Sequence, residues 1–483
     1  MIIMISTENC RLLPPHIEYA CTSAAVSFSQ NQIYAFLIRY SFPSLYFGTH
    51  ICYNKQIITH LFMGDDMANQ SDCIILGGGA SGLLACAYLA SHGLNVTLVE
   101  KLDRVGKKLM AAGNGRCNIS NTDMNPAYYG DAEAFVSDVY TAATPEDVLS
   151  FFGNLGLMTA VEDGRIYPRT MMASSVLDVL RAACDHPHVR LLTSCTAVSL
   201  RPSRRGGWSV ELDNGEGLFA PCVLSALGGR AAPHLGTDGA GTRMMGDLGH
   251  TVTPLYPALV QLRCDHSALR SLKGLRAQAA LTLLIGGKSS ARETGELLFA
   301  DYGVSGVCVF QLSGMAARAL GERKPVSLSI NLLPEIPQEQ TADWLEKRIH
   351  ALHTASALQL LSGVFPRLLA MAVLKEAGIS PDAAAIRLTA KERTALALAI
   401  SSFTLRVTGT QGFKQAQVTC GGVSLRDVDP KTMASRLYDR LYISGETLDV
   451  SGPCGGYNLH FAFASALAAS RAICAQLGIS SEI

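Results

Sequence analysis

The alternation of apolar and polar positions becomes regular at Asp72, where three short elements follow one another. Cys73-Ile-Ile-Leu76 is an apolar run, residues 83–91 place apolar side chains at helical spacing, and residues 95–99 form a second apolar run. Short, continuously apolar strands are typical of a parallel sheet that is covered on both faces. The pattern therefore predicts a β-α-β unit at the start of a parallel sheet.

Later stretches predict further strands, then an interruption, then a return to the sheet. Residues 189–227 read as strands around a turn at 213–215, and residues 258–335 are strand-like again. Residues 337–401 have helical spacing, with Trp344, Leu345, Ile349 and Leu352 near one face and breaks at Gly363 and Pro366. Residues 405–475 return to strand, glycine-rich loop and a closing helix at 461–472.

These elements predict an α/β protein with a Rossmann-like domain in two segments. We expect the segments to be residues 71–257 and 405–475, separated by an insert at 258–404. Within the insert, residues 258–335 are expected to be β-rich and residues 336–404 helical.

Residues 1–66 differ from the rest because they sustain no helical or strand periodicity. Our hypothesis is that translation begins at Met63 or Met67, which would make this leader a mis-assigned start. The alternative is an N-terminal extension. A native peptide from residues 1–62, detected by mass spectrometry, would contradict the hypothesis.

The composition indicates a packed globular protein in a reducing compartment. Of 483 residues, 48% are hydrophobic and 17% are charged, and 40 basic residues balance 40 acidic ones. Zero net charge argues against binding nucleic acid through bulk electrostatics. The 14 cysteines are scattered without a C-x-x-C pair, which favours buried thiols in the cytoplasm over a disulfide framework or a zinc site. No apolar stretch is long enough to predict a membrane span.

Gly77-Gly-Gly-Ala-Ser-Gly82 is the strongest local motif. It fits G-x-G-x-x-G, follows a predicted strand, opens a predicted helix, and is followed by Glu100 at the end of the next strand. Such glycines let the backbone approach a pyrophosphate at the helix N-terminus, and the carboxylate can accept the ribose hydroxyls. The motif predicts an adenine dinucleotide site that disfavours a 2′-phosphate. The alternative is a glycine-rich turn without a ligand.

A second loop follows, with basic residues and two glycines. Lys107, Lys108 and Arg116 could neutralise phosphate, and the segment Gly113-Asn-Gly-Arg-Cys-Asn118 could wrap the ribityl-pyrophosphate part of FAD. A solvated basic loop is the alternative for the two lysines. Cys117 could be a redox thiol if Arg116 lowered its pKa, but a small residue packed against the flavin is the favoured interpretation.

Several blocks in a fixed order resemble the BaiN/YhiN-like flavoprotein family, also labelled aminoacetone-oxidase-family FAD-binding enzymes. The resemblance runs from about Asp72 to Ala472. The blocks are Gly77–Gly82, Gly113–Asn118, Gly164–Pro168, Ala226–Gly229, Gly249–Leu259, Thr419–Ser424, Thr432–Ser435, Gly445–Val450 and Gly455–Leu459.

The resemblance implies FAD in the two-segment domain, with the insert covering the isoalloxazine ring. Asp449 is expected to hold a ribityl hydroxyl, and the helix after Gly455 is expected to point its N-terminus at the flavin edge that gains negative charge. The predicted cofactor residues are Gly77, Gly79, Ala80, Ser81, Gly82, Glu100, Lys101, Lys107, Lys108, Leu109, Gly113, Gly115, Arg116, Cys117, Asn118, Ala226, Gly228, Gly229, Gly445, Glu446, Asp449, Gly455, Gly456, Tyr457, Asn458 and Leu459.

One segment departs from the pattern of the family. Where the family has Leu-Phe-Thr-His-x-Gly-x-Ser-Gly-Pro, this chain has Asp301 in place of the His and Val307 in place of the Pro. Asp301, Tyr302 and Cys117 are the candidates for a catalytic acid. His234, His250 and His460 lack ligand spacing, so we expect core or capping roles and no metal site.

We expect an FAD-dependent oxidoreductase. The resemblance suggests an NAD(P)H-driven reductase of a conjugated C=C bond in a small molecule, with NAD(P)H visiting transiently because no second dinucleotide motif occurs. Three alternatives stay open: a dihydrouridine-forming reductase of ribosomal RNA, an amine oxidase using oxygen, and a non-catalytic flavin-binding scaffold. The RNA alternative would use a basic face of the insert, formed by Arg367, Lys375, Arg387, Lys391 and Arg393.

Overall fold

The computed structural model describes residues 71–204 and 206–480, together with the backbone of four short strands nearer the N-terminus. The chain divides into two compact units, residues 1–70 and 71–483. In the first unit the strands pair in the order β2-β1-β3-β4, and the rest of the predicted extension lies outside the described residues. These strands are β1 Ile2–Met4, β2 Val26–Ser27, β3 Ser44–Phe47 and β4 Ile51–Asn54.

A five-stranded parallel sheet is the centre of the second unit, in the order β10-β6-β5-β14-β23. Every residue of β5, β6, β14 and β23 is buried, which explains why their sequences are almost entirely apolar. The outer strand β23 comes from the C-terminal part of the chain, so the sheet is assembled from two distant segments. The strands are β5 Cys73–Leu76, β6 Val96–Val99, β10 Val189–Leu192, β14 Cys222–Ser225 and β23 Leu441–Ile443.

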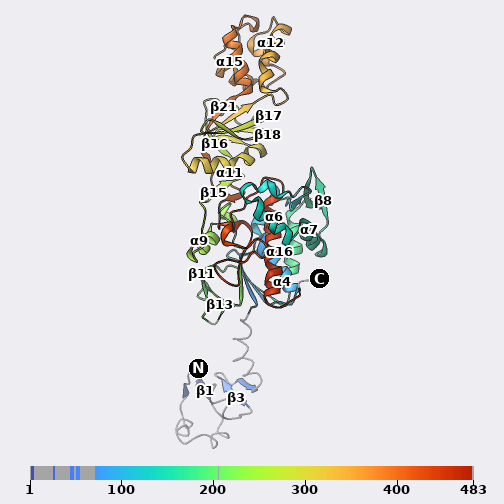
Figure 1. Cartoon of the computed structure of the whole chain (residues 1–483), viewed down its shortest axis with the longest axis vertical. Helices are drawn as coiled ribbons and strands as arrows, with labels where there is room; N and C mark the ends of the chain where they lie inside the picture. Colours follow the sequence, from blue (N-terminus) through green and yellow to red (C-terminus); the bar gives the residue numbers. More distant parts are fainter. Residues whose placement is uncertain are drawn as a thin grey trace, which may run out of the picture. The chain divides into compact units, whose positions relative to one another are not determined.

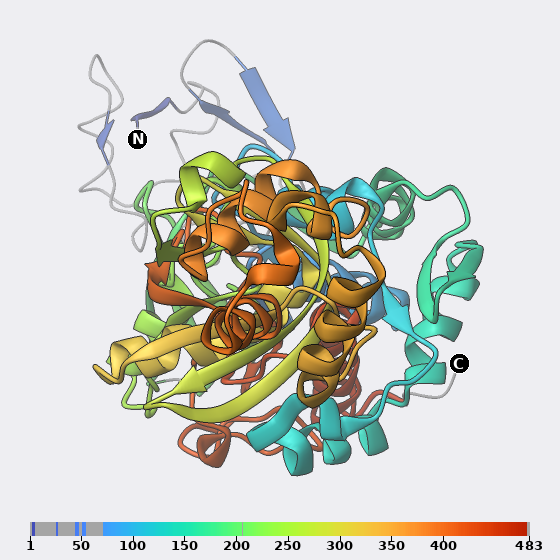
Figure 2. The ribbon, with the colours of Figure 1, turned by 90° about the horizontal axis from the view of Figure 1, so that it is seen from above.

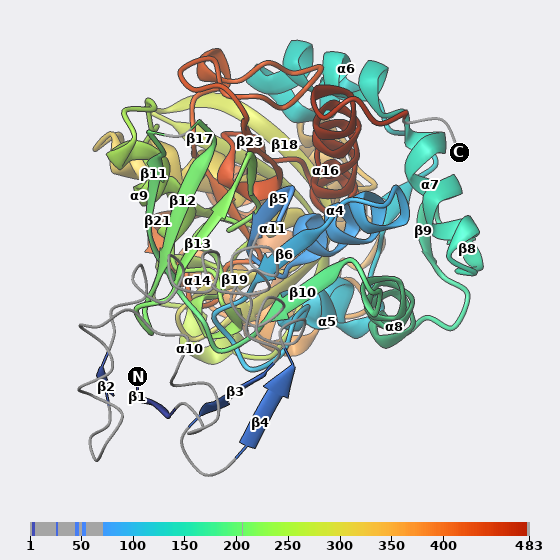
Figure 3. The ribbon, with the colours of Figure 1, turned by 90° about the horizontal axis from the view of Figure 1, so that it is seen from below.

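Two nearly apolar helices, α4 and α16, lie side by side against this sheet (Figure 3). Helix α16 is rich in Ala and Ser and is buried over most of its length, and small side chains allow two helices to approach closely. Shorter amphipathic helices complete this layer. The helices are α4 Ala80–Ser91, α5 Lys107–Ala111, α6 Glu133–Ala142, α7 Pro145–Asn154, α8 Ala173–Cys184 and α16 Tyr457–Gln476.

Two small antiparallel sheets flank the parallel sheet. The sheet β11-β12-β13 lies on the side away from α4, where the buried Trp208 donates its indole N–H to the Asp439 carbonyl oxygen at 3.1 Å (Figure 3). The other sheet has the order β7-β9-β8. The strands are β7 Ser120–Asn121, β8 Thr159–Glu162, β9 Arg165–Pro168, β11 Ala197–Pro202, β12 Trp208–Leu212 and β13 Gly217–Ala220.

The strands of the insert close into a barrel in the order β16-β19-β18-β17-β20-β21. Alternate residues of β20 and β21 point into its core, which contains the fully buried Phe299 and Phe403. Strand β21 spans the predicted boundary at 404/405, because its residues continue to pair with β16 and β20. The strands are β16 Leu262–Asp265, β17 Arg276–Ile285, β18 Lys288–Ala300, β19 Gly303–Ser305, β20 Val326–Asn331 and β21 Phe403–Thr410.

The helical part of the insert lies at the end of the barrel remote from the parallel sheet (Figures 1 and 2). Capping boxes begin α13 at Ser356 and α15 at Thr389, and Pro366 precedes α14 as the sequence predicts. Leu345 and Ile349 are buried as expected, whereas Leu352 is exposed because it follows the end of α12. The helices are α12 Thr341–Ala351, α13 Ala357–Leu361, α14 Arg367–Glu376 and α15 Ala390–Ser401.

Further elements connect the sheet domain with the barrel. Helix α11 packs against the barrel strands and against β15, which pairs with β22 near the parallel sheet. No helix among residues 71–204 and 206–480 is long and apolar enough to cross a membrane. The connecting elements are α9 Ala240–Asp247, β15 Tyr256–Ala258, α10 Leu269–Leu272, α11 Val307–Gly321 and β22 Val418–Cys420.

His460 on α16 makes stability depend on pH. It is fully buried, its ring packs edge-on against Tyr140 at 5.5 Å, and neither ring nitrogen has a hydrogen-bond partner among the described residues. Burial lowers its pKa from near 6.5 to about 3. Below pH 6.5 the unfolded chain therefore binds a proton that the folded protein excludes, and stability is lost as the pH falls.

We expect His460→Phe to remove this loss, because the ring is kept while the titrating group is lost. Between pH 7 and pH 5 the free energy of unfolding of the unmodified protein should fall by about 2 kcal/mol more than that of the variant. Denaturant unfolding at several pH values measures the difference. Parallel pH profiles would contradict the assignment, and His250, whose pKa burial also lowers, is present in both proteins.

Candidate cofactor and active site

A cavity of about 530 Å³ opens at the carboxyl ends of the parallel strands. Leu76, Val99, Ala226 and Ser444, which end or follow four of these strands, line one part of it. Residues from the barrel side, including Phe310, line another part. Ligands of open α/β sheets bind at this edge, and the volume suits an extended cofactor.

Most of the predicted cofactor residues line this cavity. They are Gly77, Gly79, Ala80, Ser81, Glu100, Lys101, Lys107, Lys108, Leu109, Gly113, Arg116, Asn118, Ala226, Gly228, Gly445, Glu446, Gly455, Gly456, Asn458 and Leu459. The others, which do not line it, are Gly82, Gly115, Cys117, Gly229, Asp449 and Tyr457.

The first glycine turn is built by close contacts between backbones. Gly77 has a φ of 103°, and a Cβ there would lie 2.5 Å from the Ala226 carbonyl oxygen. A Cβ at Gly82 would overlap the Gly77 carbonyl oxygen. Gly79 is the N-cap of α4 and no side chain caps the helix, so its first N–H groups face the cavity, where a pyrophosphate would bind.

Glu100 is held by two backbone amides. One carboxylate oxygen accepts the Gly78 N–H at 2.9 Å, and the other accepts the Leu102 N–H at 2.8 Å. These bonds orient the carboxylate at the end of β6 while it faces the cavity, as binding of ribose hydroxyls requires. Gly78 also lines the cavity and was missed from the sequence, although it lies inside the recognised motif.

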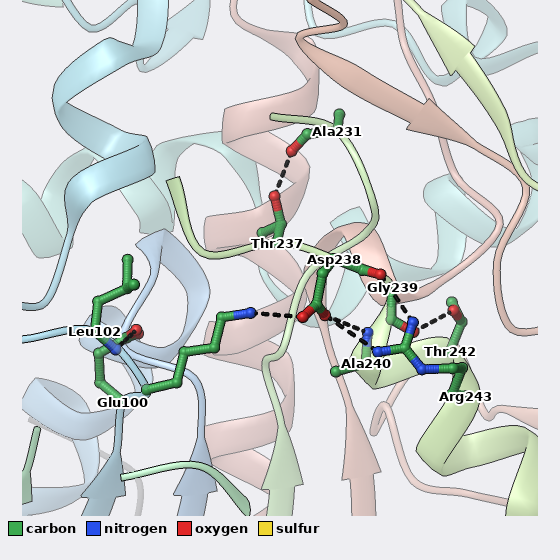
Figure 4. A network of polar contacts seen from close by, with 10 residues as sticks. Glu100, Leu102, Ala231, Thr237, Asp238, Gly239, Ala240, Thr242 and Arg243 are labelled. Atoms are coloured by element: carbon green, nitrogen blue, oxygen red, sulfur yellow. Dashed lines mark hydrogen bonds and ion pairs between the residues drawn. The ribbon is translucent and has the colours of Figure 1, made fainter. Parts of the chain in front are cut away.

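Lys101 extends from Glu100 to the loop after β14. Its Nζ lies 2.8 Å from Asp238, which also accepts the Ala240 N–H at 2.9 Å and pairs with Arg243 (Figure 4). Burial opposes ionisation of Asp238, but the bond and charge of Lys101, the Ala240 N–H and the charge of Arg243 together outweigh burial and lower the pKa of this carboxyl. Lys101 therefore ties the two sides of the cavity together at this end.

The lysines of the second loop are paired with carboxylates. Lys107 pairs with Asp103, and Lys108 lies 2.5 Å from Glu446 in the C-terminal segment. The second oxygen of Glu446 accepts the Thr419 N–H at 2.8 Å. Both lysines line the cavity, and carboxylates already neutralise their charges there.

The loop at residues 113–118 takes backbone angles that favour glycine. Gly113, Asn114 and Gly115 all have positive φ. Arg116 lies 4.4 Å above the Tyr167 ring and 2.5 Å from Glu162. The Oδ1 atom of Asn118 is buried and has no hydrogen-bond partner among the described residues.

Cys117 and the other catalytic candidates do not line the cavity. Cys117 is buried, and burial raises the pKa of its thiol to about 12, which opposes the redox interpretation. Asp301 is exposed at the turn between β18 and β19, where it lies 2.6 Å from Lys273, and Tyr302 follows it. The bond from Lys273 lowers the pKa of Asp301 and favours the charged form, which is a poor proton donor.

The C-terminal block places a second helix N-terminus at the cavity. Gly456 is the N-cap of α16, where a Cβ would overlap the Ser120 carbonyl oxygen. Asn458 bonds both the N–H and the carbonyl oxygen of Gly452 at 2.8 Å, so it shapes the loop before the helix. Asp449 accepts the Thr253 hydroxyl at 2.8 Å outside the cavity.

Several lining residues were not assigned to the site from the sequence. Val307 and Phe310 begin α11, directly after the segment that departs from the family pattern. Arg165 and Tyr167 belong to the recognised block at 164–168, whose position in the fold the sequence did not reveal. These motifs were therefore recognisable in the sequence. Which of their side chains face the cavity depends on tertiary contacts.

The residues present fit FAD. Two uncapped helix N-termini face one cavity, a glycine turn leaves room for a pyrophosphate, and Glu100 is oriented for a ribose. The unpaired Oδ1 of Asn118 is a buried acceptor that a donor of the cofactor could satisfy. A two-segment Rossmann-like domain with this site defines an FAD-dependent oxidoreductase.

The chain belongs to the HI0933-like family, because residues 71–472 match the HI0933-like protein Rossmann domain. This confirms the resemblance to BaiN/YhiN-like flavoproteins. The chain is 36% identical over 401 residues to the 3-dehydro-bile acid delta(4,6)-reductase of Clostridium scindens, covering 82% of this chain and 98% of that protein.

Two other relatives correspond to the alternatives. The ribosomal RNA dihydrouridine synthase of Escherichia coli is 28% identical over 402 residues, covering 83% of this chain and 97% of that protein. The flavin-containing amine oxidase B of Mus musculus is 37% identical over 67 residues, covering 14% of this chain and 12% of that protein.

We expect Gly82→Ala to damage the cofactor site, because its Cβ would overlap a backbone oxygen of the glycine turn. The free energy of unfolding should fall by at least about 2 kcal/mol, and FAD should bind about tenfold more weakly or worse. Gly153→Ala is the matched control, since Gly153 is exposed inside α7 with nothing near its Cβ position. It should stabilise the protein by about 0.5–1 kcal/mol. Equal FAD affinity in both variants would contradict this role of Gly82.

Proposed function

We propose that the enzyme is an NAD(P)H-driven reductase of a conjugated C=C bond in a small apolar molecule, of the 3-oxo steroid or bile-acid type. The likeness to the bile-acid reductase along 98% of that protein carries the proposal. The cavity supports it, because Leu259, Val307, Phe310 and Val418 give it an apolar wall on the barrel side. Such a wall suits a hydrophobic substrate.

When bound, FAD would supply a hydride to the acceptor. The residues of the chain would orient cofactor and substrate. Glu100 and the N-terminus of α4 would hold the adenosine and pyrophosphate, and the N-terminus of α16 would face developing negative charge. The barrel side would close the cavity and exclude water.

NAD(P)H is proposed as a transient donor. The sequence contains one G-x-G-x-x-G motif in the context of a strand and a helix, and residues of that motif line the cavity in which we propose that FAD binds. A donor that reacts and leaves needs no second dinucleotide domain.

The charge of the helical part favours a small molecule over RNA. Residues 336–404 contain seven Lys and Arg against six Asp and Glu. Arg393 is paired with Glu346 at 2.6 Å, and Arg348 donates to the carbonyl oxygens of Leu360 and Ser362. A site that binds RNA through its phosphates requires a larger excess of Lys and Arg side chains that are not paired with carboxylates.

Anaerobic spectroscopy tests the proposal. Adding NADPH or NADH to the FAD-loaded enzyme should bleach the visible flavin absorption. A 3-oxo steroid with a conjugated C=C bond should then restore the absorption while its own enone absorption is lost. The corresponding saturated 3-oxo steroid is the control and should leave the flavin bleached.

Three outcomes would contradict the proposal. Restoration of the absorption by a ribosomal RNA fragment but by no steroid would favour the dihydrouridine-forming alternative. Reduction by an amine, followed by peroxide formation in air and without any use of NAD(P)H, would favour an oxidase. A flavin that no nicotinamide reduces would remove the proposed donor.

A further inference from the structure

The cations that line the cavity differ in whether a carboxylate neutralises them. Five of them are paired: Lys101 with Asp238, Arg104 and Lys107 with Asp103, Lys108 with Glu446, and Arg116 with Glu162. Arg165 is the exception, since it makes no ion pair and no side-chain hydrogen bond among residues 71–204 and 206–480. Glu162 lies opposite it in the sheet and interacts with it electrostatically, but the ion pair of Glu162 is to Arg116. Arg165 is half-buried, so a ligand in the cavity can reach it.

Arg165 lies at the end of the cavity near the start of α16. It is on the central strand β9 of a three-stranded sheet, where its neighbours across the two ladders are Asn121 on β7 and Glu162 on β8. Asn121 donates its side-chain N–H to the Gly455 carbonyl oxygen at 3.0 Å, which attaches this sheet to the loop before α16. Glu100, at the proposed adenosine end, belongs to a different part of the lining.

The same loop contacts the barrel side of the cavity. The Cys454 N–H donates to the Gln311 side-chain oxygen of α11 at 2.7 Å. From the same end of α11, Phe310, the residue before Gln311, and the half-exposed Val307, one turn earlier, line the cavity. An unpaired guanidinium and an apolar wall therefore adjoin one loop, and together they suit a hydrophobic molecule with one electron-rich oxygen.

We propose that Arg165 binds an oxygen of the acceptor substrate that gains negative charge during reduction. The inference rests on the proposed function, in which this oxygen is the carbonyl oxygen of a conjugated enone. Addition of hydride to the β-carbon breaks the C=C π bond and moves an electron pair onto the carbonyl oxygen. A proton from solvent then adds to the α-carbon, and the C=O bond is restored. Arg165 stabilises the intermediate oxyanion through hydrogen bonds from its guanidinium.

Binding of para-nitrophenol to the FAD-loaded enzyme tests this role without turnover. Its phenolate carries a negative oxygen on an apolar ring, and difference absorption reports its ionisation. The bound probe should ionise about one pH unit lower than the free probe, or more, because a cation favours the charged form. Arg165→Met should abolish the shift. Arg169→Met is the matched control, since Arg169 is exposed on the same segment and does not line the cavity.

Kinetics of enone reduction provide the second readout. Arg165→Met should lower kcat on the order of 100-fold or more, the usual effect of losing one oxyanion donor, while FAD affinity is unchanged. Arg165→Lys should recover part of the loss, because the charge is kept without the planar fork. Arg169→Met should behave as the unmodified enzyme.

The outcomes separate this inference from the proposed function. If the probe bound to Arg165→Met ionises at the same pH as the probe bound to the unmodified enzyme, the oxyanion role is wrong. This holds even where the enzyme reduces enones. If the variant instead loses FAD while the shift persists, Arg165 serves the cofactor and the inference is overturned. If the unmodified enzyme reduces no enone but the shift depends on Arg165, the oxyanion site stands and the proposed function fails.

Discussion

The close approach of backbones at the turn between β5 and α4 is the constraint on which the site depends. The Ala226 carbonyl oxygen lies close to Gly77, and the Gly77 carbonyl oxygen lies close to Gly82. Neither glycine therefore has room for a Cβ. This contact sets α4 directly against the sheet with its N-terminus at the carboxyl edge. Ser81 then reaches Ser444 at 2.5 Å, which joins the first segment of the domain to the last.

The contact between the two segments of the domain also determines which charged and polar groups face the cavity. The N-termini of α4 and α16 face one cavity, and both are uncapped by side chains. The lysines beside them are paired with carboxylates, so their charge is largely compensated and the oriented backbone amides remain to receive phosphate and flavin oxygens. Of the cations in the described residues that line the cavity, Arg165 alone makes no ion pair, although Glu162 lies opposite it in the sheet.

The local parts of this architecture could be predicted, because they depend on neighbouring residues. The β-α-β unit, the glycine motif and Glu100 lie within about 30 residues, as a single supersecondary unit requires. Contacts between residues far apart in the sequence could not be predicted from local patterns. Lys108 meets Glu446, and Asp449 meets Thr253 rather than the cavity, because the barrel and the C-terminal segment position both partners. Likewise β21 continues past residue 404, since the pairing of its neighbours decides where it ends.

The segment that departs from the family pattern shows how topology assigns different roles to adjacent residues. Asp301 and Val307 both differ from the expected residues. The strand β19 lies between them in the sequence and leads from the exposed turn at Asp301 to the cavity at Val307. Asp301 is paired with Lys273 in solvent, so its change from His does not alter the lining. Val307, half-exposed at the first position of α11, does alter the lining. The shape of the cavity therefore depends on the start of α11, and the charge at the β18–β19 turn is a property of the surface.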